Sequence, residues 1–158
     1  MTDLEVIHSD AALSVVIARN VQVNTWTDAP TVEHLRMLSR TSTALSRKNP
    51  RGAALINLMV RGTPSFTQEV RDETVKALKQ NYFRLGTAHI ILLGGFSGTA
   101  VRAFMSTATL IARPQDPHKV FSEPEAAAAW LAPLLLQGAE AWSPVALVTL
   151  VKQSLARV

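Results

Sequence analysis

The stretch LLGGFSGTAVRA, residues 92–103, holds the residue types that could do chemistry: glycines flanking a serine at the start of a helix-like pattern. A serine nucleophile at a strand-to-helix turn needs the spacing Gly-x-Ser-x-Gly, because the glycines permit the strained turn. Here Gly98 follows Ser97 directly, one residue too early. The candidate partners Asp116 and His118 lie two residues apart and cannot easily orient each other through one imidazole ring. We therefore expect no catalytic residue and interpret Ser97 as a helix N-cap.

The same glycines could hold an anion. They lack the lysine and the spacing of a phosphate-binding loop, and they do not fit Gly-x-Gly-x-x-Gly. Backbone amides at a helix start can still contact an anion without any motif. The sequence thus predicts at most a weak, unspecific anion contact at Gly95, Ser97 and Gly98, and no nucleotide cofactor.

The histidines and acids give no pattern typical of a metal site or an acid–base pair. His8, His34, His89 and His118 show no metal-ligand spacing, so we expect no metal. The absence of cysteine excludes disulfides, thiolate catalysis and cysteine-ligated zinc. His89, inside an apolar run, is interpreted as a hydrogen-bonded core residue.

The helices and strands that place these residues can be located from apolar spacing and turn residues. β-Branched and alternating residues predict two strands that turn near Arg19 and Asn20, and continuous apolar runs predict buried strands. The predicted strands are 13–18, 21–26, 53–60, 88–95 and 118–121, with a further edge piece at 4–8. The expected helix starts are Asp28 or Pro30, Ser65, Ser97, Ser122 and Ser143.

Strands that alternate with helices predict an α/β fold. We expect a single-domain mixed sheet of about four or five strands, with an antiparallel N-terminal pair, a parallel core and helices packed on it. Residues 1–137 would form this domain, and residues 138–158 an appended amphipathic helix.

Composition limits the function classes. A chain of 158 residues that is 47% hydrophobic and 18% charged fits one globular domain. The apolar runs are too short for a membrane span, and the acidic start lacks a signal-peptide pattern, so we expect a cytoplasmic protein. The net charge is +4, and the basic residues are densest in residues 36–51. No aromatic residue that could stack on a base lies near them, which argues against nucleic acid as a partner.

The chain resembles the STAS-like families, relatives of the sporulation anti-sigma-factor antagonist and of lipid-associated bacterial proteins compared with the SEC14 domain. The order of elements and the stretches AHIILLGG and FSGTAVRAFMSTATLIARPQDPHKVFSEPEAAAAWL carry the resemblance, which covers about residues 13–135. It implies a non-catalytic regulatory or scaffold domain that acts through protein contacts. Its SEC14-like side implies the alternative of a carrier for an apolar ligand or lipid, with a small hydrolase a distant third.

One departure from the family concerns phosphorylation. Regulatory STAS domains carry a phosphorylatable serine in an Asp-Ser-Ser/Gly-Gly-Leu motif, where this chain has RGTPSFTQ. Ser65, Thr63 and Thr67 supply hydroxyls, but the acidic residue and the glycine are missing. We interpret Ser65 primarily as a helix cap, with phosphorylation as the alternative.

The C-terminal segment WSPVALVTLVKQSLARV is amphipathic. An isolated helix here would leave a wide apolar stripe in water. Although folding back on the sheet is the alternative, we predict that the stripe mediates self-association as a homodimer. The residues of this stripe are Leu147, Val148, Val151, Leu155 and Val158.

Overall fold

The N-terminal strands form an antiparallel meander. The structure, a computed structural model, describes residues 3–158. Strand β1 (Glu5–Ser9) pairs with β2 (Leu13–Ala18), which pairs with β3 (Val21–Trp26). The turn between β2 and β3 falls at Arg19 and Asn20, as predicted, and Arg19 has the positive φ of 52° that a tight turn uses.

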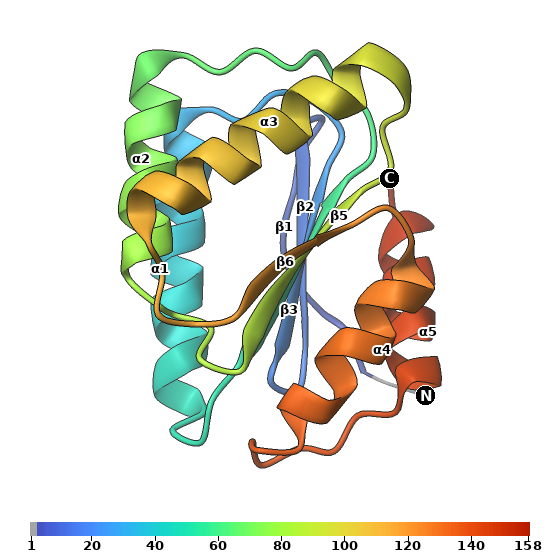
Figure 1. Cartoon of the computed structure of the whole chain (residues 1–158). Helices are drawn as coiled ribbons and strands as arrows, with labels where there is room; N and C mark the ends of the chain where they lie inside the picture. Colours follow the sequence, from blue (N-terminus) through green and yellow to red (C-terminus); the bar gives the residue numbers. More distant parts are fainter. Residues whose placement is uncertain (1–2) are drawn as a thin grey trace.

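Three parallel strands extend this meander. Strands β4 (Ala54–Met59), β5 (Gly86–Ile91) and β6 (His118–Phe121) complete a six-stranded sheet of order β1-β2-β3-β4-β5-β6. The crossovers are α1 (Val32–Lys48), α2 (Gln68–Lys79) and α3 (Gly95–Ala112). Because the strand order advances in one direction and such crossovers are right-handed, all three helices lie on the same face of the sheet (Figure 1).

The last two helices cover the opposite face. α4 (Pro124–Leu135) packs on β5 and β6, and α5 (Pro144–Leu155) packs on α4, β2 and β3. Figure 1 shows the sheet nearly edge-on, with α1, α2 and α3 on one side and α4 and α5 on the other. The chain therefore folds as three layers, helices on both sides of one sheet.

The two faces of the sheet differ in character. Alternate residues of β2 to β6 enter one continuous apolar core under α4 and α5, which includes Val23, Ile56 and Ile90. Under α1, α2 and α3 the core divides into two clusters, one around Trp26 and one around Phe83. Polar residues occupy the space between these two clusters, and they form the candidate functional site.

The predicted α/β class with a mixed sheet, an antiparallel start and a parallel core is confirmed, although the sheet has six strands rather than four or five. Four predicted helix starts are wrong by one to three residues. The observed N-caps are Thr31, Thr67, Gly94 and Glu123, in place of Asp28, Ser65, Ser97 and Ser122, whereas the predicted Ser143 cap is confirmed.

The prediction for the C-terminal stripe needs correction. Leu147 and Val151 are buried in the core under α5, and Val148 and Leu155 pack against the same cluster. Only Val158 keeps 40% of its surface exposed. The apolar face of α5 is thus covered by the chain's own sheet, and the stripe does not form a surface that a second copy could contact.

No helix within residues 3–158 combines the length and the apolar character that crossing a bilayer requires.

Candidate functional site

A row of polar residues crosses the inner face of the sheet at matching register. Asn24 on β3, Asn57 on β4 and His89 on β5 are direct partners in the parallel ladder. Since side chains alternate between faces along a strand, the three point the same way, under α1, α2 and α3. They replace the apolar residues that a doubly covered parallel sheet normally has at such positions.

A directed chain of hydrogen bonds runs along this row. The Trp26 indole nitrogen can only donate, so the atom of Asn57 that lies 3.0 Å from it is the carbonyl oxygen. The Asn57 amide nitrogen then donates to Nδ1 of His89 at 3.3 Å. With Nδ1 as an acceptor, neutral His89 carries its proton on Nε2, which donates to Nδ1 of His118 at 3.2 Å. His118 therefore keeps its own proton on Nε2.

Both histidines are neutral in this arrangement. Burial, together with the nearby His118, lowers the pKa of His89 to about 3. Burial likewise lowers the pKa of His118 to about 4. Desolvation disfavours the charged form of a histidine, and a second imidazolium within hydrogen-bonding distance would add repulsion. At neutral pH the pair offers dipoles and hydrogen bonds but no net charge.

A cavity of about 170 Å³ lies between this row and the three helices. Its walls are mostly apolar and come from all three helices and from the loops after β3 and β4. A cavity of about 150 Å³ is enough to admit a benzene-sized molecule. Representative lining residues are Leu38 and Ser42 of α1, Ala77 and Leu78 of α2, and Val101 and Phe104 of α3.

Three polar groups of the cavity wall remain without a partner. Asn24 Oδ1 accepts from Gln22, and within residues 3–158 its amide nitrogen has no hydrogen bond. His118 Nε2 is likewise unpaired in the described residues. The Asp116 Oδ2 atom is buried without a partner, and burial raises the pKa of this carboxyl despite the nearby Arg84. Of these three, Asp116 Oδ2 is the buried atom, and the two N–H groups are open to water or to a ligand in the cavity.

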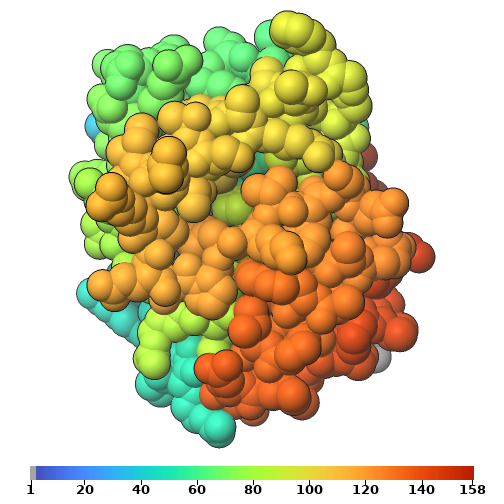
Figure 2. Space-filling view, in the orientation of Figure 1, coloured from blue at the N-terminus to red at the C-terminus, as the bar shows by residue number. Residues whose placement is uncertain are grey.

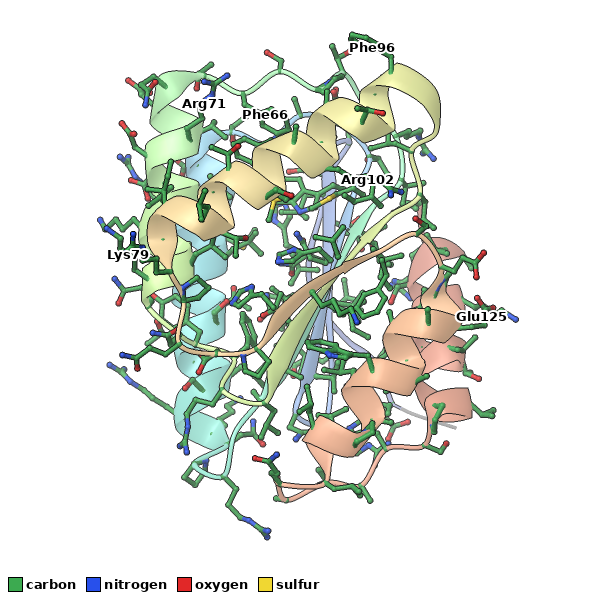
Figure 3. All side chains as sticks on the ribbon, viewed as in Figure 1. Phe66, Arg71, Lys79, Phe96, Arg102 and Glu125 are labelled. Carbon is green, nitrogen blue, oxygen red and sulfur yellow. The ribbon has the colours of Figure 1, made fainter. Side chains whose placement is uncertain are left out.

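The segment before α2 closes one end of the cavity. Phe66, labelled in Figure 3, stacks on Phe104 of α3 with ring centroids 3.8 Å apart. Gly62, at φ +124°, packs so closely on the backbone of Asp28 that a Cβ atom would overlap it. The exposed residues Asp28, Arg61 and Thr63 line the cavity at this end, outside the carboxyl ends of the parallel strands, where ligands commonly bind in α/β folds.

The surface is also hollowed at the edge of the sheet. Figure 2 shows a depression between α3 and β6, with atoms from the region of β5 at its floor. His118 and Asp116 are the cavity residues contributed by β6 and the turn before it.

In the glycine-rich segment, the predicted N-cap at Ser97 is wrong, and the anion contact predicted at Gly95, Ser97 and Gly98 stays a prediction for the first two residues only. Ser97 is the third residue of α3, and Gly94 occupies the N-cap position. The amide of Gly98 donates to the carbonyl of Gly94 inside the helix, so that amide is not available to an anion. Gly95 is exposed at the helix start with φ +60°.

The hydroxyls considered for phosphorylation lie on the segment that precedes α2. Thr67 caps α2, because its hydroxyl accepts from the backbone amide of Val70 at 3.2 Å. Ser65 and Thr63 are exposed, and Thr63 also belongs to the cavity wall. The predicted cap at Ser65 is wrong, and its phosphorylation remains a prediction.

Most of the site was not predicted from the sequence. His89 was expected as a hydrogen-bonded core residue, and this is confirmed. The sequence analysis does not single out Asn24 or Asn57. For Asn57 the available signal is a lone polar residue inside the apolar run ALINLM, whereas Asn24 lies in the alternating strand VQVNTW and gives no such signal. The sequence analysis weighs Asp116 and His118 as triad partners of Ser97, and His118 also as a metal ligand, whereas the structure brings both residues to the cavity with His89.

Comparison with known protein families, curated proteins and solved structures found no match for this chain.

Proposed function

We propose that this chain is a non-catalytic binding domain for a small, mostly apolar ligand that carries an uncharged hydrogen-bonding group. The observation that carries the proposal is the cavity of about 170 Å³ whose apolar walls surround unpaired polar groups on the sheet. Apolar pockets with a few convergent polar groups are the usual form of a small-molecule site. The SEC14-like side of the STAS-like resemblance supports the same class of ligand.

The polar groups favour an uncharged head group. Asn24 and His118 present N–H donors, which suit the oxygen of a carbonyl, an amide or an alcohol. The two histidines are neutral, and burial raises the pKa of Asp116 despite the nearby Arg84. A charged ligand would lose its hydration here without gaining an opposite charge on the sheet.

The same hydrogen bonds argue against hydrolysis by the histidine pair of the cavity. An activated serine or threonine needs a histidine within hydrogen-bonding distance of its hydroxyl. Within residues 3–158, His89 bonds only Asn57 and His118, and His118 bonds only His89. The pair therefore lacks the nucleophile that a hydrolase requires.

A cavity-filling variant tests this proposal. Ala77→Phe places a ring at the cavity wall, and Ala129→Phe places the same ring on the exposed face of α4 as a control. Titration with the uncharged dye N-phenyl-1-naphthylamine should show saturable fluorescence for the full chain and for Ala129→Phe, and at least a tenfold loss of affinity for Ala77→Phe. Equal affinity for all three chains would contradict the proposal.

A second candidate function is contact with another protein through α3. Phe96 is 92% exposed and Leu110 is 74% exposed, and both project from the outer side of this helix (Figure 3 shows Phe96). Arg102 is the only charged residue in the helix sequence GFSGTAVRAFMSTATLIA. Exposed apolar side chains on a helix with so little charge are typical of an interaction surface.

In this second candidate, α3 replaces α5 as the surface through which two copies would associate. Light scattering should then give a dimer mass for the full chain and a monomer mass for Leu110→Glu. Leu136→Glu, a similarly exposed leucine just beyond α4, is the matched control and should remain dimeric. A monomer mass for the full chain at all concentrations would overturn the candidate.

A further inference from the structure

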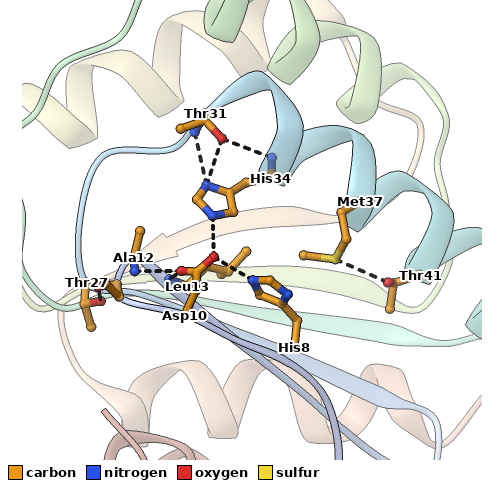
Figure 4. A network of polar contacts seen from close by, with 10 residues as sticks. His8, Asp10, Ala12, Leu13, Thr27, Thr31, His34, Met37 and Thr41 are labelled. Atoms are coloured by element: carbon orange, nitrogen blue, oxygen red, sulfur yellow. Dashed lines mark hydrogen bonds and ion pairs between the residues drawn. The ribbon is translucent and has the colours of Figure 1, made fainter.

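Three side chains from separate parts of the chain meet beside the first β-hairpin. His8 lies at the end of β1, Asp10 lies in the turn that follows, and His34 lies in the first turn of α1. One carboxylate oxygen, Oδ2 of Asp10, is 2.7 Å from Nε2 of His8 and 2.8 Å from Nε2 of His34 (Figure 4). The three donor atoms lie within 4.8 Å of one another.

The spacing of these atoms is close to that of a metal centre. Zinc binds histidine nitrogen and carboxylate oxygen at about 2.0–2.2 Å, so neighbouring ligands of a tetrahedral site lie about 3.3 Å apart. The observed 2.7 and 2.8 Å are hydrogen-bond distances, in which a proton occupies the place between the atoms. Exchange of these protons for a cation requires each of these two nitrogen–oxygen distances to widen by only about half an ångström. The two Nε2 atoms must also adopt a similar separation, and all three ligand atoms already lie within 4.8 Å of one another.

The carboxylate is held in place by the backbone. Its other oxygen, Oδ1, accepts from the amides of Ala12 at 2.7 Å and Leu13 at 2.9 Å. Partial desolvation raises the pKa of Asp10, but the hydrogen bonds from His34, Ala12, His8 and Leu13 outweigh it and hold this pKa well below its usual range. Asp10 is therefore an oriented anion, as metal-ligating carboxylates are.

His34 also has the outer support that metal-binding histidines use. Its Nδ1 lies 3.0 Å from the hydroxyl oxygen of Thr31. When Nε2 binds a cation, the ring proton lies on Nδ1, where the Thr31 hydroxyl oxygen can accept it, in place of the 3.4 Å hydrogen bond that the Thr31 backbone amide donates to Nδ1. The edge-to-face contact between the Trp26 and His34 rings, with centroids 5.7 Å apart, fixes the imidazole on its other side.

We propose that His8, Asp10 and His34 form a binding site for one divalent transition-metal ion of the zinc type. Two imidazoles and one carboxylate are a ligand set that zinc and its neighbours accept, and the solvent-exposed side of the cluster leaves room for water to complete the coordination. The metal joins the end of β1 to the start of α1. It crosslinks the N-terminal hairpin to the helix layer that covers the cavity.

The proposed zinc site shares no histidine with the polar row of the cavity, so a variant of one site serves as the control for the other. All four histidines fall into two pairs, His8 with His34 and His89 with His118. A variant of one pair therefore tests whether zinc binds there or at the other. His118→Gln is the matched control for His8→Phe, which keeps an aromatic ring on the exposed end of β1.

The test uses the tag-free full chain after treatment with a chelator. Calorimetric titration with ZnCl₂ at pH 7.5 should give one Zn²⁺ per chain. His8→Phe and Asp10→Asn should each weaken this binding at least about tenfold, the smallest effect expected when a metal site loses a supporting group. His118→Gln should bind as tightly as the unaltered chain.

Thermal unfolding gives a second readout. At a zinc concentration of 100 times Kd the melting temperature should rise by roughly 5–10 °C for the unaltered chain and for His118→Gln, and should not rise for His8→Phe. Absence of saturable binding, equal binding by His8→Phe, or loss of binding only in His118→Gln would each overturn the proposal. If Asp10→Asn fails to fold, the His8→Phe result alone tests the proposal. His8 lies on the edge strand β1, so we expect its replacement to leave the fold intact.

Discussion

At the scale of single residues, the polar row replaces apolar packing by a chain of hydrogen bonds in which each residue donates to the next, from Trp26 toward His118. Trp26 can only donate, and this fixes the orientation of the Asn57 amide and then the tautomer of each histidine in turn. The predicted tautomer of both His89 and His118 is therefore the one with the proton on Nε2. Long-range ¹H–¹⁵N correlation spectra at pH 7 should show this form for both rings, and a proton on Nδ1 of either would contradict the assigned chain of donors.

The neutral histidines make stability depend on pH. The pKa of each is lowered from 6.5, to about 3 for His89 and about 4 for His118. Their contribution to stability is complete above pH 6.5 and is lost as the pH falls toward these values, because the unfolded chain then binds protons that the folded chain does not. Each histidine should lower the free energy of unfolding by roughly 1.4 kcal/mol per pH unit in this range.

Urea denaturation at pH 6.5, 6.0, 5.5 and 5.0 measures this dependence. His118→Gln removes one of the two titrating groups and should reduce the slope of unfolding free energy against pH by about half. His8→Phe serves as the control, since this variant leaves the buried pair intact. An unchanged slope in His118→Gln would show that His118 is not a buried neutral group.

Some residues of the site could be predicted from the sequence and others could not. His89 inside an apolar run already indicated a buried, hydrogen-bonded histidine. The register that aligns Asn24, Asn57 and His89 depends on how β3, β4 and β5 pair, which their separate sequences do not specify. The meeting of His8, Asp10 and His34 depends on tertiary contacts in the same way, because His34 is 24 residues from Asp10.

At the scale of elements, α5 shows why the sequence predicts a second copy of the chain as the partner of its apolar stripe, although the chain's own sheet covers it. Its amphipathic stripe was recognised correctly, but a stripe specifies only that something covers it. The strand order explains what covers it, because three right-handed crossovers in one direction leave the second face of the sheet without helices. There α4 packs mainly on β5 and β6. α5 covers β2 and β3, which α4 leaves exposed.

A truncation within α5 tests this packing. Leu150 is fully buried in the core under the helix, and Val145 on the same helix is 76% exposed. Leu150→Ala should lower the free energy of unfolding by about 2–5 kcal/mol, the usual cost of such a cavity. Val145→Ala should change it by less than about 0.5 kcal/mol, as surface substitutions do. Equal effects in urea denaturation would show that α5 does not pack on the sheet.

The start of α3 gives a second test at this scale. A Cβ atom on Gly98 would overlap the carbonyl oxygen of Leu93, whereas a Cβ on Gly94 would meet nothing within 4 Å. Gly98→Ala should therefore destabilise the fold by about 1–3 kcal/mol, as overpacking does. Gly94→Ala is the matched control, and its φ of −95° suits alanine. Equal melting temperatures for the two variants would contradict this close packing at the strand-to-helix turn.

At the scale of the whole molecule, the two faces of the sheet have different roles in folding and binding. The face under α4 and α5 has one continuous apolar core, and the face under α1, α2 and α3 has two clusters separated by the cavity and the polar row. A cavity and a buried polar row cost stability that a packed apolar layer would have supplied. The continuous core on the opposite face compensates for this cost, and it depends on the C-terminal segment.

Residues 138–158 should therefore be required for folding. They contribute Trp142, Leu147, Leu150 and Val151 to the continuous core, and the Trp142 indole donates to Asn20 Oδ1 in the β2–β3 turn at 3.0 Å. Burial of four such side chains contributes roughly 6–12 kcal/mol. This is comparable with the roughly 5–15 kcal/mol by which whole domains are stable.

A truncated chain tests this requirement. A chain that ends at Gln137 should show no cooperative thermal transition and poor dispersion of amide proton shifts. The control is a chain that lacks only the exposed Arg157 and Val158, which should unfold like the full chain. A folded monomer that ends at Gln137 would show that the segment is an appendage and that the second face of the sheet does not need it.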